Sequence, residues 1–335
     1  MSVASAPGKI ILSGEHSVVY GAPALAFSVK QRLTVNFTPD LLPRLSWFAP
    51  DKPHEMALEK FSSLRHKLDA AFEGYLRGER SISEIFSRPA ELIFYTVDVA
   101  RILGNLERIP RGKFDIQSDI PVGAGMGSSA ALLAALLKLF SKHEDLPSLI
   151  EQVRHCERLQ HGRGSLIDAA AVTMGGLVKV EQGQASQLGT LPDMFDRDWY
   201  WIFTGTPATS TGVCVERVRL QFERSDIWSE FSAVTNRIEA AQTDIDQLSR
   251  AIQDNHRLLN RIGVVPARVS ALIEQIEGMG GAAKIAGAGA VSGDAGGLVL
   301  AYLPNQTPDA LKLPPLMRWG RVESDGLGVS LGDDL

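Results

Sequence analysis

A glycine-rich segment that runs into an apolar helix constrains this chain more than any other part of its sequence. Residues 121–130 read Pro-Val-Gly-Ala-Gly-Met-Gly-Ser-Ser-Ala, and residues 131–137 are all alanine or leucine. Glycines carry no Cβ atom, so the backbone can approach a ligand closely. The first N–H groups of the helix are unpaired and carry partial positive charge. The segment therefore predicts a phosphate seat, although a tight strand-to-helix connection with Ser128 or Ser129 as N-cap would look the same.

Size and charge limit the functions that need considering. A length of 335 residues favours about two domains, and 44% hydrophobic with 22% charged residues is ordinary for a globular protein. The net charge of −5 argues against a nucleic-acid partner. Cys156 and Cys214 form no metal-ligand pattern and suggest a reducing compartment. With no secretion signal and no apolar run long enough for a bilayer, we expect a cytoplasmic enzyme or binding protein without a membrane partner. A homodimer is left open.

Hydrophobic patterning predicts a mixed chain. Alternating or short apolar runs predict strands at 9–12, 33–37, 114–116, 177–180, 199–203 and 298–303. Helical patterns cover 55–78, 90–104 and 225–278, the last broken at Gly263 and Pro266. Because strands and helices do not alternate regularly, we expect an α+β fold rather than a doubly wound sheet. A boundary near 185–195 divides the chain into domains at 1–187 and 188–335.

The helix predicted from Ser148 onward carries a carboxylate on its apolar side. Ser148-x-x-Glu151 predicts a capping box at its start. At about 100° per residue, Ile150 and Val153 share one face, and Glu157 falls inside it. An ionised carboxylate there is costly unless it is paired. The helix alone favours a buried salt bridge or a side chain that reaches solvent, and leaves open a metal ligand or site carboxylate.

A short loop follows that helix. Residues 161–168 read His-Gly-Arg-Gly-Ser-Leu-Ile-Asp, and the glycines predict the end of the helix. Asp168 could cap a new helix from Ala169, or it could act as a general base held in a tight loop. The residues by themselves favour the cap.

Three separated segments together resemble the GHMP small-molecule kinases, and among them the mevalonate kinases most. Residues 5–25 are similar to that family's opening segment almost position for position. Residues 121–130 resemble its Pro-x-Gly-x-Gly-Leu-Gly-Ser-Ser-Ala motif, with Met126 for leucine, and residues 284–297 stand where its C-terminal glycine motif lies. Residues 255–264 resemble the preceding helix. The resemblance implies a two-domain α+β fold. Its N-terminal domain would be like domain 2 of ribosomal protein S5, and its C-terminal domain a ferredoxin-like α/β sandwich.

The resemblance also implies roles for single residues. Asp168 matches the family's catalytic aspartate, and Lys9 matches the lysine between that aspartate and the phosphates of ATP. Ser129 and Glu157 match the residues that hold Mg²⁺, which favours the functional interpretation of the carboxylate on the apolar face. The nucleotide contacts that the resemblance implies are Ser118, Gly123, Ala124, Gly125, Met126, Gly127, Ser128 and Ser129.

On the acceptor side, Glu15 and His16 match the family's substrate-side Gly-Glu-His element, and Thr211 resembles the threonine that helps to orient the aspartate. The implied acceptor is the C5 hydroxyl of (R)-mevalonate. Two segments depart from the family pattern: Leu166 replaces the usual glycine before Asp168, and residues 287–297 include an acidic residue, Asp294. Another GHMP kinase acting on phosphomevalonate or a sugar, an ATP-dependent decarboxylase and a non-catalytic nucleotide-binding homologue therefore stay open.

Overall fold

The computed structural model describes residues 2–48, 53–121, 123–141, 145–162, 166–241 and 243–332. The strands are β1 (Ser2–Ser13), β2 (Ala24–Pro39), β3 (Arg44–Phe48), β4 (Pro53–Ala57), β5 (Gly112–Ser118), β6 (Leu177–Glu181), β7 (Gln184–Gly189), β8 (Trp199–Phe203), β9 (Ala282–Ile285), β10 (Leu298–Tyr302), β11 (Arg318–Arg321) and β12 (Ser330–Leu331). The α-helices are α1 (Phe61–Leu76), α2 (Ala90–Leu103), α3 (Ser128–Ser141), α4 (Leu146–His161), α5 (Leu166–Met174), α6 (Thr211–Phe222), α7 (Ile227–Ala240), α8 (Ile245–Arg261) and α9 (Ala267–Gly278). Short 3₁₀ helices are η1 (Ser17–Tyr20), η2 (Leu58–Lys60), η3 (Ile82–Glu84), η4 (Asp193–Asp196) and η5 (Pro308–Leu311).

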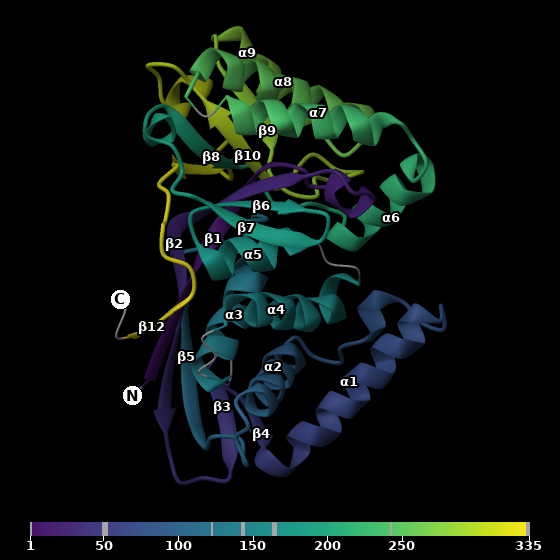
Figure 1. Ribbon diagram of the computed structural model, residues 1–335, viewed down its shortest axis with the longest axis vertical. Helices are drawn as coiled ribbons and strands as arrows, with labels where there is room; N and C mark the ends of the chain where they lie inside the picture. Colours follow the sequence, from purple (N-terminus) through teal and green to yellow (C-terminus); the bar gives the residue numbers. More distant parts are fainter. Residues whose placement is uncertain are drawn as a thin grey trace.

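Within the described ranges, the strands form an eight-stranded and a four-stranded sheet (Figure 1). The larger sheet has the order β12-β1-β2-β5-β3-β4, with β6 paired to β2 and β7 paired to β6. The long strand β2 makes this branching possible, because residues 24–27 pair with β6 and residues 33–39 pair with β5. The smaller sheet has the antiparallel order β11-β8-β10-β9.

Helix α3 occupies the centre of the first half of the molecule. Its alanine- and leucine-rich sequence favours a helix and offers no polar group to most of its surroundings, so nearly the whole helix is buried. It packs on β1 and β2 and contacts α2, α4 and α5 (Figure 1). The start of α3 is therefore fixed close to β1.

Helices α8 and α9 pack on the smaller sheet, and α7 packs against α8 and contacts β1 and η1 (Figure 1). Strand β8 of this sheet, which consists of aromatic and aliphatic residues, is buried along its whole length. The two halves of the molecule thus meet along β1 and the loop after it. None of the described helices is both long enough and apolar enough to cross a membrane.

The α+β class is confirmed, as are strands at all six predicted places. The helix predicted over 55–78 is wrong at its start, because residues 53–57 pair with β3 as strand β4 and the α-helix begins only at Phe61. The helical stretch 225–278 does break at Gly263 and Pro266. A further break separates the end of α7 at Ala240 from the start of α8 at Ile245, where Asp244 caps α8 by accepting hydrogen bonds from the N–H groups of Asp246 and Gln247.

The predicted helix starts need three further corrections. Helix α4 begins at Leu146 with Asp145 as its N-cap, which accepts a hydrogen bond from the Ser148 N–H, so no capping box forms from Ser148. Helix α3 begins at Ser128, which puts Ser128 and Ser129 in its first turn rather than at its N-cap. Helix α5 begins at Leu166, so Asp168 also lies in a first turn and is not the cap.

The predicted division between residues 187 and 188 falls inside strand β7. After the smaller sheet, the chain returns to the larger one, where β12 pairs with β1. Arg32 of β2 reinforces this return by pairing with Asp325 and donating to the carbonyl oxygens of Leu327 and Gly328. The larger sheet therefore contains both ends of the described chain, and the division into two domains stays a prediction.

Candidate active site

A cavity lies where the end of β1 meets α4, α5, α6 and the segment after β9. Six of the residues singled out from the sequence line it: Lys9, Glu15, His16, Glu157, Asp168 and Thr211. Gly125 of the glycine-rich segment contributes to the wall as well. Residues from the beginning, the middle and the last third of the chain thus converge on one place.

Lys9 is the buried cation of this cavity. Its side chain is 2% exposed, and its Nζ atom lies 3.0 Å from Asp168 Oδ1. The same ammonium donates a hydrogen bond to the Gly125 carbonyl oxygen at 2.9 Å. The Asp168 side chain is 33% exposed, so the ion pair opens to the cavity on its carboxylate side. Any reacting group that enters the cavity meets Asp168 with Lys9 behind it.

The glycine-rich segment is shaped around Lys9. Gly123, Gly125 and Gly127 have φ angles of 74°, 82° and 75°, a backbone region that side chains rarely adopt. A Cβ atom at Gly127 would lie 2.8 Å from the Lys9 side chain, and the Lys9 N–H donates to the Met126 carbonyl oxygen at 2.9 Å. The segment therefore needs glycine both for its turn and for its contact with the lysine.

Glu157 is the carboxylate that α4 carries into the interior. It is 5% exposed, and within the described part of the chain it receives no hydrogen bond and forms no ion pair. Burial raises the pKa of Glu157 to about 8, the charge of Asp168 adds to this rise, and Lys9 opposes it. A buried carboxylate without a partner is the kind of group that a bound cation would stabilise.

The residues around Glu157 fit a magnesium ion that binds together with phosphate. In such sites Mg²⁺ usually takes one or two protein oxygens and completes its shell with phosphate oxygens and water. The described residues contain no group of three His, Cys, Asp or Glu side chains that could hold an ion by themselves. The Ser129 hydroxyl donates at 2.9 Å to Gln160, which lies three residues after Glu157 on α4. Ser129 is thus tied to α4, the helix that carries Glu157.

The remaining predicted nucleotide contacts lie outside the cavity wall. Ser118 is exposed at the end of β5, where its hydroxyl accepts a hydrogen bond from the Ile120 N–H at 3.1 Å. The other predicted contacts that do not line the cavity are Gly123, Ala124, Met126, Gly127, Ser128 and Ser129.

Glu15 and His16 follow directly after β1 and are both held by the segment around β9. Glu15 forms an ion pair with Lys284, and both side chains are almost fully buried. His16 Nε2 lies 3.0 Å from the Ala288 carbonyl oxygen. Because a carbonyl oxygen can only accept, Nε2 carries the proton and Nδ1 is left as an acceptor. Burial lowers the pKa of His16 to about 4; Lys284 adds to this, and the bond to Ala288 opposes it.

Thr211 is the first residue of α6, which Ser210 caps by accepting from the Val213 N–H. Nearby, the Thr209 hydroxyl accepts a hydrogen bond from the Val291 N–H, which ties the start of α6 to the glycine-rich residues 287–297. Asp294, in that same segment, is exposed and does not line the cavity.

Sequence reasoning missed His161 and Lys284. His161 lines the cavity one turn after Glu157 on α4, where burial lowers its pKa, Asp168 raises it and Lys9 lowers it. The helical spacing from Glu157 was a signal that could have found it. No pattern near Glu15 pointed to Lys284, because the two residues are 269 positions apart. Tyr20, which also lines the cavity, stacks on Trp228 with ring centroids 4.1 Å apart.

Comparison with known proteins places this arrangement in a family. The GHMP kinases N terminal domain matches residues 94–176. A mevalonate kinase of Thermococcus onnurineus is 30% identical over 329 residues, covering 91% of this chain and 90% of the relative. A mevalonate kinase of Archaeoglobus fulgidus is 27% identical over 314 residues, covering 91% of this chain and 94% of the relative.

Fold comparison agrees. The crystal structure of the Methanococcus jannaschii mevalonate kinase superposes with a TM-score of 0.77 at 18% identity, covering 96% of this chain and 98% of that one. With sequence similarity over nine-tenths of its length and the same fold, this chain belongs to the GHMP kinase family, and the relatives that it resembles along that length are mevalonate kinases.

Proposed function

We propose that this protein transfers the terminal phosphoryl group of ATP to the C5 hydroxyl of (R)-mevalonate, giving 5-phosphomevalonate and ADP. One observation carries the proposal: the Lys9–Asp168 pair opens into a cavity beside a glycine-rich helix start. The relatives matched over nine-tenths of the chain are named mevalonate kinases, which supports this acceptor.

Phosphoryl transfer depends mainly on positioning and on neutralising charge. Asp168 would accept the proton of the attacking hydroxyl, or orient that hydroxyl, because its carboxylate faces the cavity. Lys9 would stabilise the negative charge that develops on the transferred group. Its bond to the Gly125 carbonyl keeps the ammonium fixed between the carboxylate and the glycine-rich segment, so little reorganisation is needed during reaction.

The phosphates of ATP would lie along residues 123–129, where the N-terminus of α3 offers unpaired N–H groups. Ser129 and Glu157 are the residues that would hold Mg²⁺. When bound, this ion neutralises phosphate charge and orients the terminal phosphoryl group. The raised pKa of Glu157 and its lack of a partner among the described residues support that role.

On the acceptor side, the His16 ring presents an acceptor nitrogen, so in its neutral form it would pair with a hydroxyl of the acceptor. Contact with the carboxylate of mevalonate would require His16 to take up a proton. Glu15 and Thr211 line the same wall and would complete the acceptor site.

We also infer a cytoplasmic protein whose partner is a small molecule. Both cysteines are free and buried, which supports a reducing compartment. The net charge of −5 disfavours nucleic acid and anionic lipid surfaces as partners. Homodimer formation stays a prediction.

The test is an assay of the purified protein with ATP and Mg²⁺. (R)-mevalonate, phosphomevalonate and galactose are offered in parallel, and ADP, CO₂ and product mass are measured. The proposal expects one phosphate added to mevalonate without CO₂ release. A preference for another acceptor would identify a different GHMP kinase, and release of CO₂ would indicate a decarboxylase. If no ADP forms with any of the three compounds, the result would indicate a non-catalytic homologue.

A further inference from the structure

The loop after β1 is tied to the second half of the molecule at closely spaced positions. The Ser13 hydroxyl lies 2.7 Å from the hydroxyl of Thr235 on α7 and accepts a hydrogen bond from Asn255 on α8 at 2.8 Å. His16 donates to the Ala288 carbonyl oxygen. These contacts fix the backbone of the loop on both sides of Glu15.

Between these two contacts lies the ion pair of Glu15 and Lys284. The Lys284 side chain is 0% exposed and that of Glu15 is 1% exposed. Lys284 Nζ also donates to the Ile11 carbonyl oxygen at 3.2 Å, so it contacts both the last residues of β1 and the loop that follows. Strand β9, which carries Lys284, is the edge strand of the smaller sheet next to β10. The lysine therefore joins the two sheets.

A buried ion pair of this kind is a poor device for stability alone. Removing two charges from water costs about as much as their attraction returns, and well-packed apolar residues often do as well or better. The other charge that faces this pair is that of Lys9. Burial lowers the pKa values of the neighbouring His16 and His256 to about 4, so both histidines are neutral. Among the described residues, Glu15 is the carboxylate that acts on Lys284.

The ion pair satisfies only one of the two carboxylate oxygens of Glu15. Lys284 contacts Glu15 Oε1, whereas Glu15 Oε2 is buried and has no hydrogen-bond partner within the described part of the chain. A buried acceptor that stays unsatisfied carries a desolvation cost. Because Glu15 lines the same cavity as Asp168, a bound molecule with a hydroxyl donor can remove that cost.

On the basis of the phosphoryl transfer proposed above, we propose that Lys284 is a positioning residue for the acceptor. It holds Glu15 as an oriented carboxylate at the cavity wall and leaves one oxygen to accept a hydrogen bond from an acceptor hydroxyl. In this way the smaller sheet sets the geometry of the acceptor half of the site, while the nucleotide half depends on β1, α3 and α4.

The test compares four variants of the full chain: Glu15→Gln, Lys284→Met, Lys284→Arg and the double variant Glu15→Leu/Lys284→Met. Glu15→Gln keeps an oxygen for Lys284 but turns the free acceptor into a donor. We expect its kcat/KM for the acceptor to fall by about 10- to 100-fold, the effect of losing a hydrogen bond to a charged group, while KM for ATP changes less than about twofold.

The double variant separates positioning from stability, because it leaves no buried charge unpaired. We expect it to unfold at nearly the wild-type temperature and yet to keep the loss of acceptor kcat/KM seen in Lys284→Met. Lys284→Arg should recover part of that loss. Asp325→Asn is the matched control, because it breaks another ion pair between distant segments, outside the cavity wall. It should lower the unfolding temperature without changing kcat/KM.

Two results would overturn the proposal: wild-type acceptor kinetics in Glu15→Gln or in the double variant, or an equal rise in the KM values of acceptor and ATP. If Lys284→Met does not fold, Glu15→Gln and the double variant still decide. If the wild-type protein phosphorylates a different alcohol, only the assignment of mevalonate as the acceptor is refuted. The role of Lys284 is then tested by comparing the same variants with that alcohol.

Discussion

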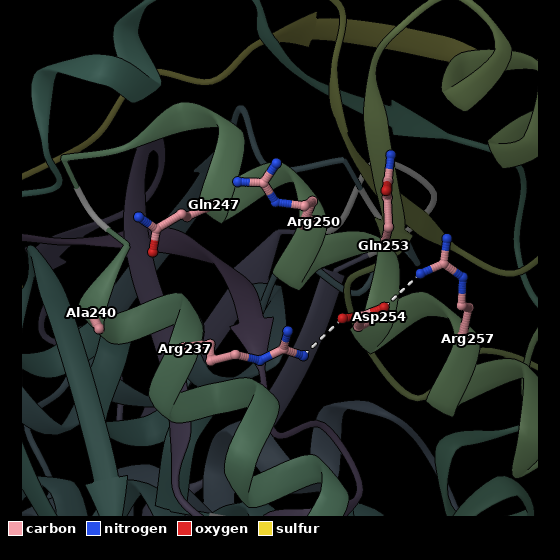
Figure 2. Close-up of a pocket in the computed structure, with 7 residues that line it drawn as sticks. All are labelled: Arg237, Ala240, Gln247, Arg250, Gln253, Asp254 and Arg257. Carbon is pink, nitrogen blue, oxygen red and sulfur yellow. Dashed lines mark hydrogen bonds and ion pairs between the residues drawn. The ribbon is translucent and has the colours of Figure 1, made fainter.

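Two of the hollows in the described part of this molecule can be compared, because charged side chains line both and they differ in burial as well as in size. The groove between α7 and α8 measures about 530 Å³, against about 130 Å³ for the cavity at the end of β1. Figure 2 shows Arg237 and Arg257 reaching the single carboxylate of Asp254, with Arg250 close by. The side chains of Arg237 and Arg257 are 53% and 59% exposed, whereas Lys9 is 2% exposed.

This difference decides what the charges can do. Water and salt screen exposed pairs, which contribute little to stability and hold no group in a strained protonation state. At the end of β1, burial raises the pKa of Glu157 and lowers that of His16, and the charges of Asp168 and Lys284, respectively, add to these shifts. A larger, more basic groove is therefore a weaker candidate for chemistry than a small cavity with few, fixed charges.

Among the variants that test the importance of the buried cavity, Asp168→Asn should have the largest effect. The change removes the group that receives or orients the acceptor proton but keeps the shape of the side chain. We expect kcat to fall by about 10²- to 10⁴-fold, with ATP affinity nearly unchanged. Steady-state kinetics and calorimetric titration with a non-hydrolysable ATP analogue measure the two quantities. A kcat close to that of the wild type would remove Asp168 from the mechanism.

His16→Gln tests whether burial governs the histidine. The folded protein keeps His16 neutral down to about pH 4, whereas the unfolded chain takes up a proton near its ordinary value of 6.5. Between these values the unfolded state binds more protons, so this residue makes stability rise with pH through that window and fall as pH drops.

The glutamine variant should lack this dependence, and the window corresponds to roughly 3 kcal/mol. Chemical unfolding from about pH 4 to about pH 7 measures the difference. If the difference between the two proteins stayed constant over that range, the histidine would be solvated rather than buried.

Glu157→Gln tests whether the buried carboxylate of α4 holds a cation. Without its charge, the site should need about 10- to 100-fold more Mg²⁺ for half-maximal activity. The stability of the metal-free protein should not fall, because the change removes a buried carboxylate that has no partner among the described residues. An unchanged magnesium titration would return Glu157 to a purely structural role.

Asp254→Asn in the exposed groove should produce the smallest effect. It loosens Arg237 and Arg257, yet we expect the free energy of unfolding to change by no more than about 0.5 kcal/mol and kcat/KM to stay at the wild-type value. Thermal unfolding and the kinase assay check both. A large loss of activity would show that exposure is the wrong criterion for separating the two hollows.

The parts of the site that could be predicted from sequence are those with local signals. The burial of Glu157 followed from helical periodicity, because α4 is a regular amphipathic helix. The contact between Gly127 and Lys9 shows why position 127 needs a glycine. Helix starts were predicted less well: Asp145 caps α4 in place of Ser148, because both residues suit an N-cap and only packing chooses between them.

The pairing of Glu15 with Lys284 could not be predicted, because it depends on how two sheets meet. Lys284 lies in an otherwise apolar strand, where a lysine suggests an exposed edge. Only the return of β9 toward the end of β1 reveals a buried partner. Long-range pairs of this kind leave no local pattern in either segment.

The return of β12 to the edge of β1 has a practical consequence for anyone who trims this protein. The smaller sheet is, in topology, an insertion between β7 and β12 of the larger one. A fragment that stopped after β10 would strip the outer neighbour from β1 and the guanidinium contacts from Arg32, thereby damaging the half of the molecule that had been left whole in sequence. Excising the insertion and rejoining its flanks would be the more promising way to isolate that half.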